Sequence, residues 1–142
     1  MYRFEQLLEV QIPLVNKFYK HCRYSSKAGR GEVIFVLKGD AGIVAAVRLE
    51  PKNDGWYFLR AMCVDPSLRG QGVGSQLLKS IEAFLSSSRV YCFPFDHLVD
   101  FYSQASFVVF SPDIAPSFIK DACLRYQQQG RKICIMANHC FA

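Results

Sequence analysis

Three glycines spaced two residues apart form the part of the sequence best suited to bind a ligand. Gly70, Gly72 and Gly74 follow Arg69, between a strand-like run ending at Val64 and an apolar pattern of helical spacing. Glycines at the start of a helix expose backbone N–H groups, and the positive end of the helix dipole lies at the same place. Such a site binds a phosphate or diphosphate, to which an arginine could add a charged donor. The loop therefore predicts a phosphate-bearing ligand.

Two common phosphate-binding motifs fit this loop less well. A Walker loop requires a lysine after its last glycine, and here Ser75 follows Gly74 directly. A dinucleotide fingerprint has an acidic residue about 20 residues further on, and Asp96 stands near that offset. The spacing, however, is GxGxG, residues 66–69 separate the glycines from the strand, and the preceding strands read as antiparallel. Glycine spacing alone is therefore weak evidence for a nucleotide fold.

The longer string around the glycines is more specific. Residues 64–78 match, at every fixed position, the acetyl-CoA-binding motif V-x-P-x-x-R-G-x-G-[IV]-G-x-x-L-L, and so resemble the GNAT family of N-acetyltransferases. Residues 101–107 are similar to the second motif of that family, FYxxxGF, with Ser106 in place of the glycine. Residues 2–4 and the helix after them resemble its first strand and helix. The resemblance covers the chain from Met1 to about Phe110.

The resemblance implies roles for three groups of residues. Backbone amides of the glycine loop would hold the pyrophosphate of acetyl-CoA, and the end of the preceding strand would pair with its pantetheine arm. Tyr102 would lie near the thioester sulfur and protonate the leaving thiolate, as a phenol in a partly dry site can. No metal site is expected. The pyrophosphate group comprises Arg69, Gly70, Gln71, Gly72, Val73, Gly74 and Ser75, and the pantetheine group comprises Met62, Cys63 and Val64.

Two departures from the family concern the acceptor side. Many members carry a glutamate as general base where Phe58 stands, six residues before Val64. His97 and Asp96 are alternative bases, although a surface residue and a helix cap are the ordinary explanations for them, and a water chain to solvent is a third alternative. The second departure is a whole helix within residues 113–129, where the family has a short connection. We expect this helix to lie over the acceptor side.

The hydrophobic pattern predicts a mixed α/β fold of the α+β kind. Turn clusters separate three strands of an antiparallel meander, and helices and strands alternate after the glycine loop. The resemblance implies the GNAT fold, with a mostly antiparallel sheet splayed between its fourth and fifth strands and an extra helix before the last strand. The predicted strands are Glu32–Leu37, Ile43–Glu50, Trp56–Val64, Val90–Phe95, Phe107–Phe110 and Ile133–Ala137, and the predicted helices are Ile12–His21, Val73–Leu85 and 113–129, with a further helix capped by Asp96.

Length and composition predict one domain over residues 1–142. A chain of 142 residues that is 51% hydrophobic can bury an adequate core without staples. No apolar run approaches the roughly 18 residues of a membrane span, and an acid interrupts the N-terminus where a signal peptide is apolar. A cytoplasmic location without a membrane partner is expected. The 6 cysteines include no CxxC pair, which predicts free thiols.

The net charge of +5 is concentrated in stretches without acids. One such stretch, residues 10–31, contains five Lys or Arg residues, and the resemblance places part of it on the acceptor wall. Like-charge repulsion there disfavours polyamines and favours neutral or acidic acceptors. Nucleic acid is not an expected partner, because the basic stretches lack interleaved aromatic residues on a recognisable binding module.

Two functions follow. The first is an enzyme, acting as a monomer or homodimer, that transfers an acetyl group from acetyl-CoA to an amine of a small molecule or peptide. The second is a catalytically weak, acetyl-CoA-binding regulator that docks on a partner protein. The intact glycine motif and Tyr102 favour the enzyme, whereas Phe58 in place of the glutamate favours the regulator.

Overall fold

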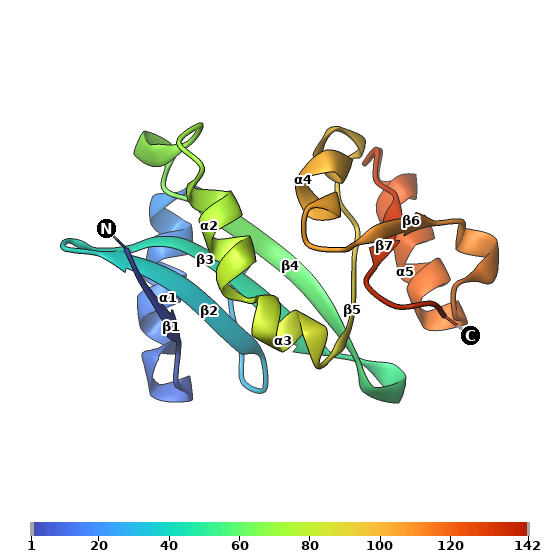
Figure 1. Cartoon of the computed structure of the whole chain (residues 1–142), viewed down its shortest axis with the longest axis horizontal. Coiled ribbons are helices and arrows are strands. Elements are labelled where there is room, and N and C mark those ends of the chain that lie inside the picture. Colours follow the sequence, from blue (N-terminus) through green and yellow to red (C-terminus); the bar gives the residue numbers. More distant parts are fainter. Residues whose placement is uncertain (1, 142) are drawn as a thin grey trace.

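The computed structural model describes residues 2–141, whose strands form one sheet in the order β1-β2-β3-β4-β5-β7-β6 (Figure 1). All neighbouring pairs are antiparallel except β4 and β5. The strands are β1 (Arg3–Gln6), β2 (Val33–Gly39), β3 (Gly42–Pro51), β4 (Trp56–Val64), β5 (Arg89–Cys92), β6 (Val108–Phe110) and β7 (Ile135–Ala137). The helices are α1 (Ile12–His21), α2 (Val73–Ser80), α3 (Glu82–Ser86), α4 (Val99–Ser103) and α5 (Ser117–Gln128).

Helices cover both faces of the meander formed by β1 to β4 (Figure 1). Successive side chains of a strand point to opposite faces. Accordingly Phe35 and Leu37 of β2 are buried in the cluster that includes α2 and α3, whereas Ile34 and Val36 are buried in the cluster that includes α1. Burial on both faces explains why β2 reads as an unbroken apolar run in the sequence.

The parallel ladder between β4 and β5 is short and ends at the third residue of β4. It runs from the pair Trp56–Arg89 to the pair Phe58–Tyr91. Beyond that point the strands diverge, and residues 59–64 have no partner strand on this side within the described chain (Figure 1). The expected splay between the fourth and fifth strands is therefore confirmed.

A bulge accompanies the splay. The β3–β4 register shifts between Ala46 and Arg48, and Ala61 of β4 takes a left-handed φ of 58°. The Tyr19 hydroxyl of α1 donates a hydrogen bond of 2.8 Å to the Ala61 carbonyl. Left-handed backbone is uncommon for a residue other than glycine. Contacts from a neighbouring helix thus support the strained part of β4.

The second half of the sheet packs against α5. Trp56, Phe58 and Tyr91 form a buried cluster with Ile119 and Cys123 of this helix. The helix predicted within residues 113–129 is therefore present, and it lies next to β6 and β7 (Figure 1) and packs against the paired ends of β4 and β5. All six cysteine thiols are free, as expected.

Three local predictions need correction. The helix predicted from Val73 to Leu85 is broken at Ile81, whose ψ of 7° is not helical, and continues as α3. The strand predicted to reach Phe95 ends at Cys92. Asp96 does not cap a helix through its side chain, because it begins a 3-10 turn and α4 starts only at Val99.

The backbone conformation of Ser106 matches the one expected for the glycine that it replaces in the second motif. Its φ is 67°, in the left-handed region that glycine adopts without steric cost. The chain therefore keeps at Ser106 the backbone turn that FYxxxGF provides with a glycine, and this turn ends the α4 region before Phe107 enters the core.

A buried ion pair fixes the loop between α1 and β2. Arg48 of β3 is only 1% exposed, and its guanidinium contacts Glu32 at 3.1 Å. The same guanidinium donates to the Lys27 carbonyl and to the Ser26 hydroxyl. The Arg48 guanidinium thus ties Ser26, Lys27 and Glu32 of this loop to β3.

We predict that Glu32→Gln lowers the free energy of unfolding by about 3 kcal/mol, because it leaves the buried Arg48 charge without its counter-ion. Chemical denaturation monitored by circular dichroism measures this loss. Glu9→Gln is the matched control, since the Glu9–Arg30 pair is exposed and such pairs contribute about 0–1 kcal/mol. Equal effects of the two substitutions would contradict the structural role of the Arg48 pair.

Candidate functional site

The glycine loop begins at a capped turn. The Asp65 carboxylate accepts hydrogen bonds from the Ser67 amide at 2.9 Å and the Ser67 hydroxyl at 2.8 Å, and it also meets His21 at 3.1 Å. The Ser67 hydrogen bonds hold the pKa of Asp65 below its usual value. This cap ends β4 and directs the chain into the turn at Pro66–Leu68.

The glycines then place backbone amides around an open space. Gly70 and Gly72 both have a φ of 79°, and a Cβ built on either would meet nothing within 4 Å. Helix α2 begins after Gly72 without a side-chain cap, and the Gln76 amide is the first to bond within the helix. Amides before Gln76 therefore lack intrahelical partners, and they converge at the positive end of the helix dipole. The geometry fits a diphosphate, as the sequence predicts.

A groove of about 460 Å³, here called the glycine groove, joins this loop to the free edge of β4. Of the ten residues predicted to bind the cofactor, nine line it, and Gln71 instead donates a hydrogen bond to the Ser67 carbonyl at 3.4 Å. The lining comprises Tyr24, Met62, Cys63, Val64, Leu68, Arg69, Gly70, Gly72, Val73, Gly74, Ser75, Leu98, Phe101 and Tyr102.

A second groove of about 210 Å³, here called the aromatic groove, lies between the separated strands and α5. Most of its wall is apolar or aromatic, and its charged members are Arg60 and Arg131. No Asp or Glu lines it within residues 2–141. The lining comprises Tyr24, Phe58, Leu59, Arg60, Ala61, Met62, Cys92, Phe93, Pro94, Phe95, Leu98, Tyr102, Tyr126, Arg131 and Ile133.

The two grooves share a wall at the splay. Tyr102 lines both, together with Tyr24, Met62 and Leu98. Tyr102 is 7% exposed, and Phe101 meets its ring edge-on with the ring centres 5.0 Å apart. Burial raises the pKa of Tyr102 well above its usual value, so the hydroxyl keeps its proton at neutral pH. A buried, protonated phenol that borders two grooves can donate its proton to a ligand bound beside it.

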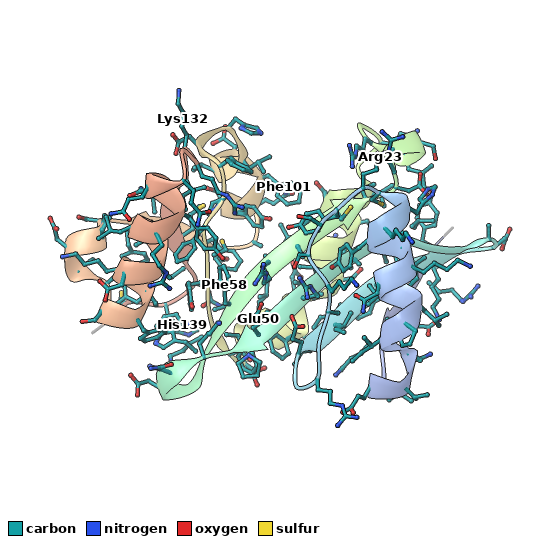
Figure 2. The ribbon with its side chains drawn as sticks, turned by 180° about the vertical axis from the view of Figure 1, so that it is seen from behind. Arg23, Glu50, Phe58, Phe101, Lys132 and His139 are labelled. Carbon is teal, nitrogen blue, oxygen red and sulfur yellow. The ribbon has the colours of Figure 1, made fainter. Side chains whose placement is uncertain are left out.

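The position of the missing glutamate is filled by packing. Phe58 stacks on Tyr91 with ring centres 5.0 Å apart. Glu50 pairs with Phe58 across the β3–β4 ladder and lies beside it (Figure 2). Burial favours the neutral form of Glu50, but hydrogen bonds from Arg60 at 2.7 Å and Lys52 at 3.1 Å outweigh it, and its pKa is lowered. Glu50 is therefore an engaged anion and a poor proton acceptor.

The alternative bases are not brought to the site. Asp96 and His97 are exposed, and neither lines a groove. The His97 ring stacks on Phe95 with ring centres 5.9 Å apart, which is the surface role that the sequence allows.

Sequence reasoning missed three residues that line the aromatic groove. Tyr24 comes from the loop held by Arg48, whereas Tyr126 and Arg131 come from α5 and the segment after it. The Arg131 guanidinium lies 4.8 Å from the centre of the Tyr126 ring. The only signal in the sequence was the expectation that a helix within residues 113–129 covers the acceptor side, which names no side chain.

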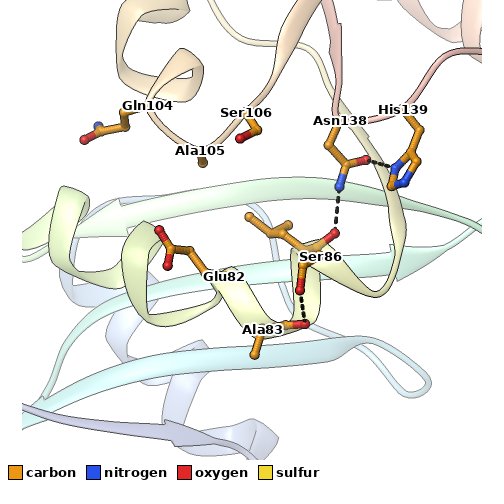
Figure 3. A pocket seen from close by; sticks show the side chains of 9 residues that line it. Glu82, Ala83, Ser86, Gln104, Ala105, Ser106, Asn138 and His139 are labelled. Atoms are coloured by element: carbon orange, nitrogen blue, oxygen red, sulfur yellow. Dashed lines mark hydrogen bonds between the residues drawn. The ribbon is translucent and has the colours of Figure 1, made fainter.

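A further cavity of about 620 Å³ lies between α3 and the turn after α4 (Figure 3). Its most engaged polar residue is Asn138, whose side-chain amide donates to the Leu85 and Ser88 carbonyls and whose oxygen accepts from the Val90 amide. These bonds tie the start of β5 to the end of α3. The Asn138 side chain therefore has a structural role. Tyr102 does not line this cavity.

Two further properties bear on function. Within residues 2–141, no helix combines the length and hydropathy needed to cross a bilayer. The same residues contain no group of three or more His, Cys, Asp or Glu side chains arranged to hold a metal ion.

Several solved structures share this fold at low sequence identity. N-acetylglutamate synthase from Neisseria gonorrhoeae, complexed with coenzyme A and N-acetyl-glutamate, aligns with a TM-score of 0.68 and 15% identity over 100% of this chain and 35% of its own. Escherichia coli ElaA gives 0.67 and 17% over 98% and 100% of the two chains. The ribosomal-protein-S18-alanine N-acetyltransferase from Escherichia coli gives 0.66 and 17% over 96% and 92%. These likenesses establish the fold.

Comparison with sequence families is more direct. No curated protein sequence matches the chain. The model of the acetyltransferase (GNAT) domain matches residues 30–109, which include β2 to β4, the glycine loop and Tyr102. The match covers more than half of the chain, and it contains every residue that lines the glycine groove except Tyr24. The chain belongs to the GNAT family of acetyltransferases.

Proposed function

We propose that this protein is an N-acetyltransferase in which Tyr102 acts as the general acid. The observation that carries the proposal is the position of Tyr102 in the wall shared by the glycine groove and the aromatic groove. Acetyl-CoA is the co-substrate of the family, and an amine is the acceptor. The Neisseria synthase supports this arrangement, because its structure contains coenzyme A and an acetylated amino acid together.

The chain offers separate partners to each part of acetyl-CoA. The amides that begin α2 suit the pyrophosphate, and the exposed Arg69 adds a positive charge at the same loop. The backbone of Met62, Cys63 and Val64 lies on the edge of β4 that β5 leaves free, so it can pair with the amide groups of pantetheine. This path leads from the loop along the glycine groove to Tyr102.

The reaction requires one bond to form and one to break. The neutral amine nitrogen, held in the aromatic groove, forms a bond to the acetyl carbon, and the carbon–sulfur bond breaks. Tyr102 donates its proton to the sulfur and regains one from solvent. The proton that leaves the nitrogen passes to water, because no carboxylate of residues 2–141 lines the groove. Positioning the two ligands supplies most of the acceleration.

Phe58 supports a second candidate, an acetyl-CoA-binding regulator. A stacked aromatic ring at the usual position of the general base impairs a catalyst more than it impairs a protein that only binds acetyl-CoA. Such a protein would bind acetyl-CoA through the same glycine groove and would show no turnover with any amine.

We predict that Gly72→Glu abolishes the rise in melting temperature that acetyl-CoA causes in the wild-type protein. A carboxylate at this position would enter the open space in front of the amides and repel the pyrophosphate. Gly31→Glu is the matched control, because Gly31 has a φ of 81°, is equally open and lies outside both grooves. Thermal unfolding with and without acetyl-CoA tests this assignment, and a normal shift in the Gly72 variant would refute it.

We predict that Tyr102→Phe lowers kcat and kcat/KM together by roughly 100-fold, because the ring is kept and only the proton donor is lost. Acetyl-CoA affinity should change little. Tyr57→Phe, a tyrosine that packs against Phe84 away from both grooves, should retain wild-type rates. Steady-state kinetics with acetyl-CoA and an amine that the wild-type protein acetylates distinguishes the two variants, and wild-type turnover in the Tyr102 variant would exclude this residue from proton transfer.

We further predict the shape of the pH profile. The raised pKa of Tyr102 keeps its proton bound up to and beyond pH 10, the ordinary value for tyrosine. Activity should therefore rise with pH as the amine loses its proton, and it should show no falling limb below about pH 10. A rate of acetylation measured from pH 6 to pH 10 checks this. A decline beginning near pH 8 would show that another group, and not Tyr102, supplies the proton.

A further inference from the structure

We propose that the acceptor is a free α-amino acid with an aromatic side chain, whose carboxylate binds Arg131. The proposal rests on the proposed acetyl transfer and names the substrate class of the aromatic groove. It is carried by three properties of that groove: its aromatic wall, the uncompensated guanidinium at its edge, and the lack of a carboxylate among the described residues that line it.

The wall of the groove is suited to a flat apolar body. The Phe58 and Phe93 rings lie 5.0 Å apart, and the Phe93 and Tyr126 rings lie 5.8 Å apart, in tilted and edge-on arrangements. Aromatic rings in such arrangements attract a further ring beyond the effect of buried area. The cavity volume of about 210 Å³ is below the range of about 300–1,000 Å³ for drug-sized ligands. A single amino acid fits this size class better than a folded protein surface.

The two arginines of the groove differ in whether an acidic side chain compensates their charge. Arg60 is bound to Glu50 at 2.7 Å, so its charge is largely compensated. Arg131 forms no ion pair with any described residue, and its guanidinium carbon lies 4.8 Å from the centre of the Tyr126 ring. A guanidinium on an aromatic face keeps its N–H groups free for a carboxylate, which it can bind through two parallel hydrogen bonds.

The same charge disfavours other amines. A positive groove without a carboxylate repels polyamines and lysine side chains. An amino acid brings its own carboxylate to Arg131, and burial against the aromatic wall favours the neutral form of its amine where a glutamate base is missing.

The test compares L-phenylalanine with L-phenylalaninamide, which lacks only the negative charge, and with spermidine. We expect acetylation of phenylalanine to exceed that of the other two. Arg131→Gln should lower kcat/KM for phenylalanine about 10-fold, mainly through KM, and should leave that for the amide within about 2-fold. Arg125→Gln is the matched control, because it removes an exposed charge of α5 that lies outside the groove.

A binding measurement provides a second readout. Calorimetric titration with N-acetyl-L-phenylalanine should show affinity that Arg131→Gln weakens about 10-fold and Arg125→Gln does not change. Faster acetylation of the amide or of spermidine would overturn the acceptor class and leave acetyl transfer intact. Absence of carboxylate-dependent binding in the wild-type protein would also overturn the proposed acceptor class. Carboxylate-dependent binding without turnover would support the ligand class and contradict acetyl transfer.

Discussion

The early end of the β4–β5 ladder is the constraint on which the site depends. Because the last pair is Phe58–Tyr91, six residues of β4 keep a free edge, and the space beside them becomes two grooves. Stacking of Phe58 on Tyr91 closes the point where the strands separate. The Tyr19 hydrogen bond to Ala61 supports the bulged part of β4 beyond it. Contacts from α1 at Ala61 and from α5 at Trp56 and Phe58 thus support β4 on both sides of the point where the ladder ends.

The sequence predicted the parts of the molecule whose chemistry is local. The glycine loop at the start of a helix and the apolar run of β2 follow from backbone and burial rules that need no knowledge of distant residues. The break of the helix at Ile81 and the left-handed Ser106 could not be predicted, because tertiary packing overrides local preference at both. Tyr126 and Arg131 contact each other locally at the end of α5, but they reach the groove only because α5 packs against the sheet, which no local pattern reveals.

The aromatic groove shows how one residue changes the polarity and the proton chemistry of a site. At the position where the resemblance places a glutamate in many members, Phe58 joins a cluster of rings, and the nearby Glu50 is held by Arg60 and Lys52 with a lowered pKa. The groove is consequently apolar and positive, so it selects the neutral form of an amine and does not extract a proton from it. In the proposed reaction, proton donation is retained through the buried Tyr102.

A crystal structure with coenzyme A bound tests most directly the claim that the splay brings both ligands to Tyr102. The account predicts the pyrophosphate on the amides that begin α2, the pantetheine arm along Met62 to Val64, and the sulfur beside the Tyr102 hydroxyl. Coenzyme A bound instead in the cavity between α3 and the turn after α4, or with its sulfur away from Tyr102, would contradict it.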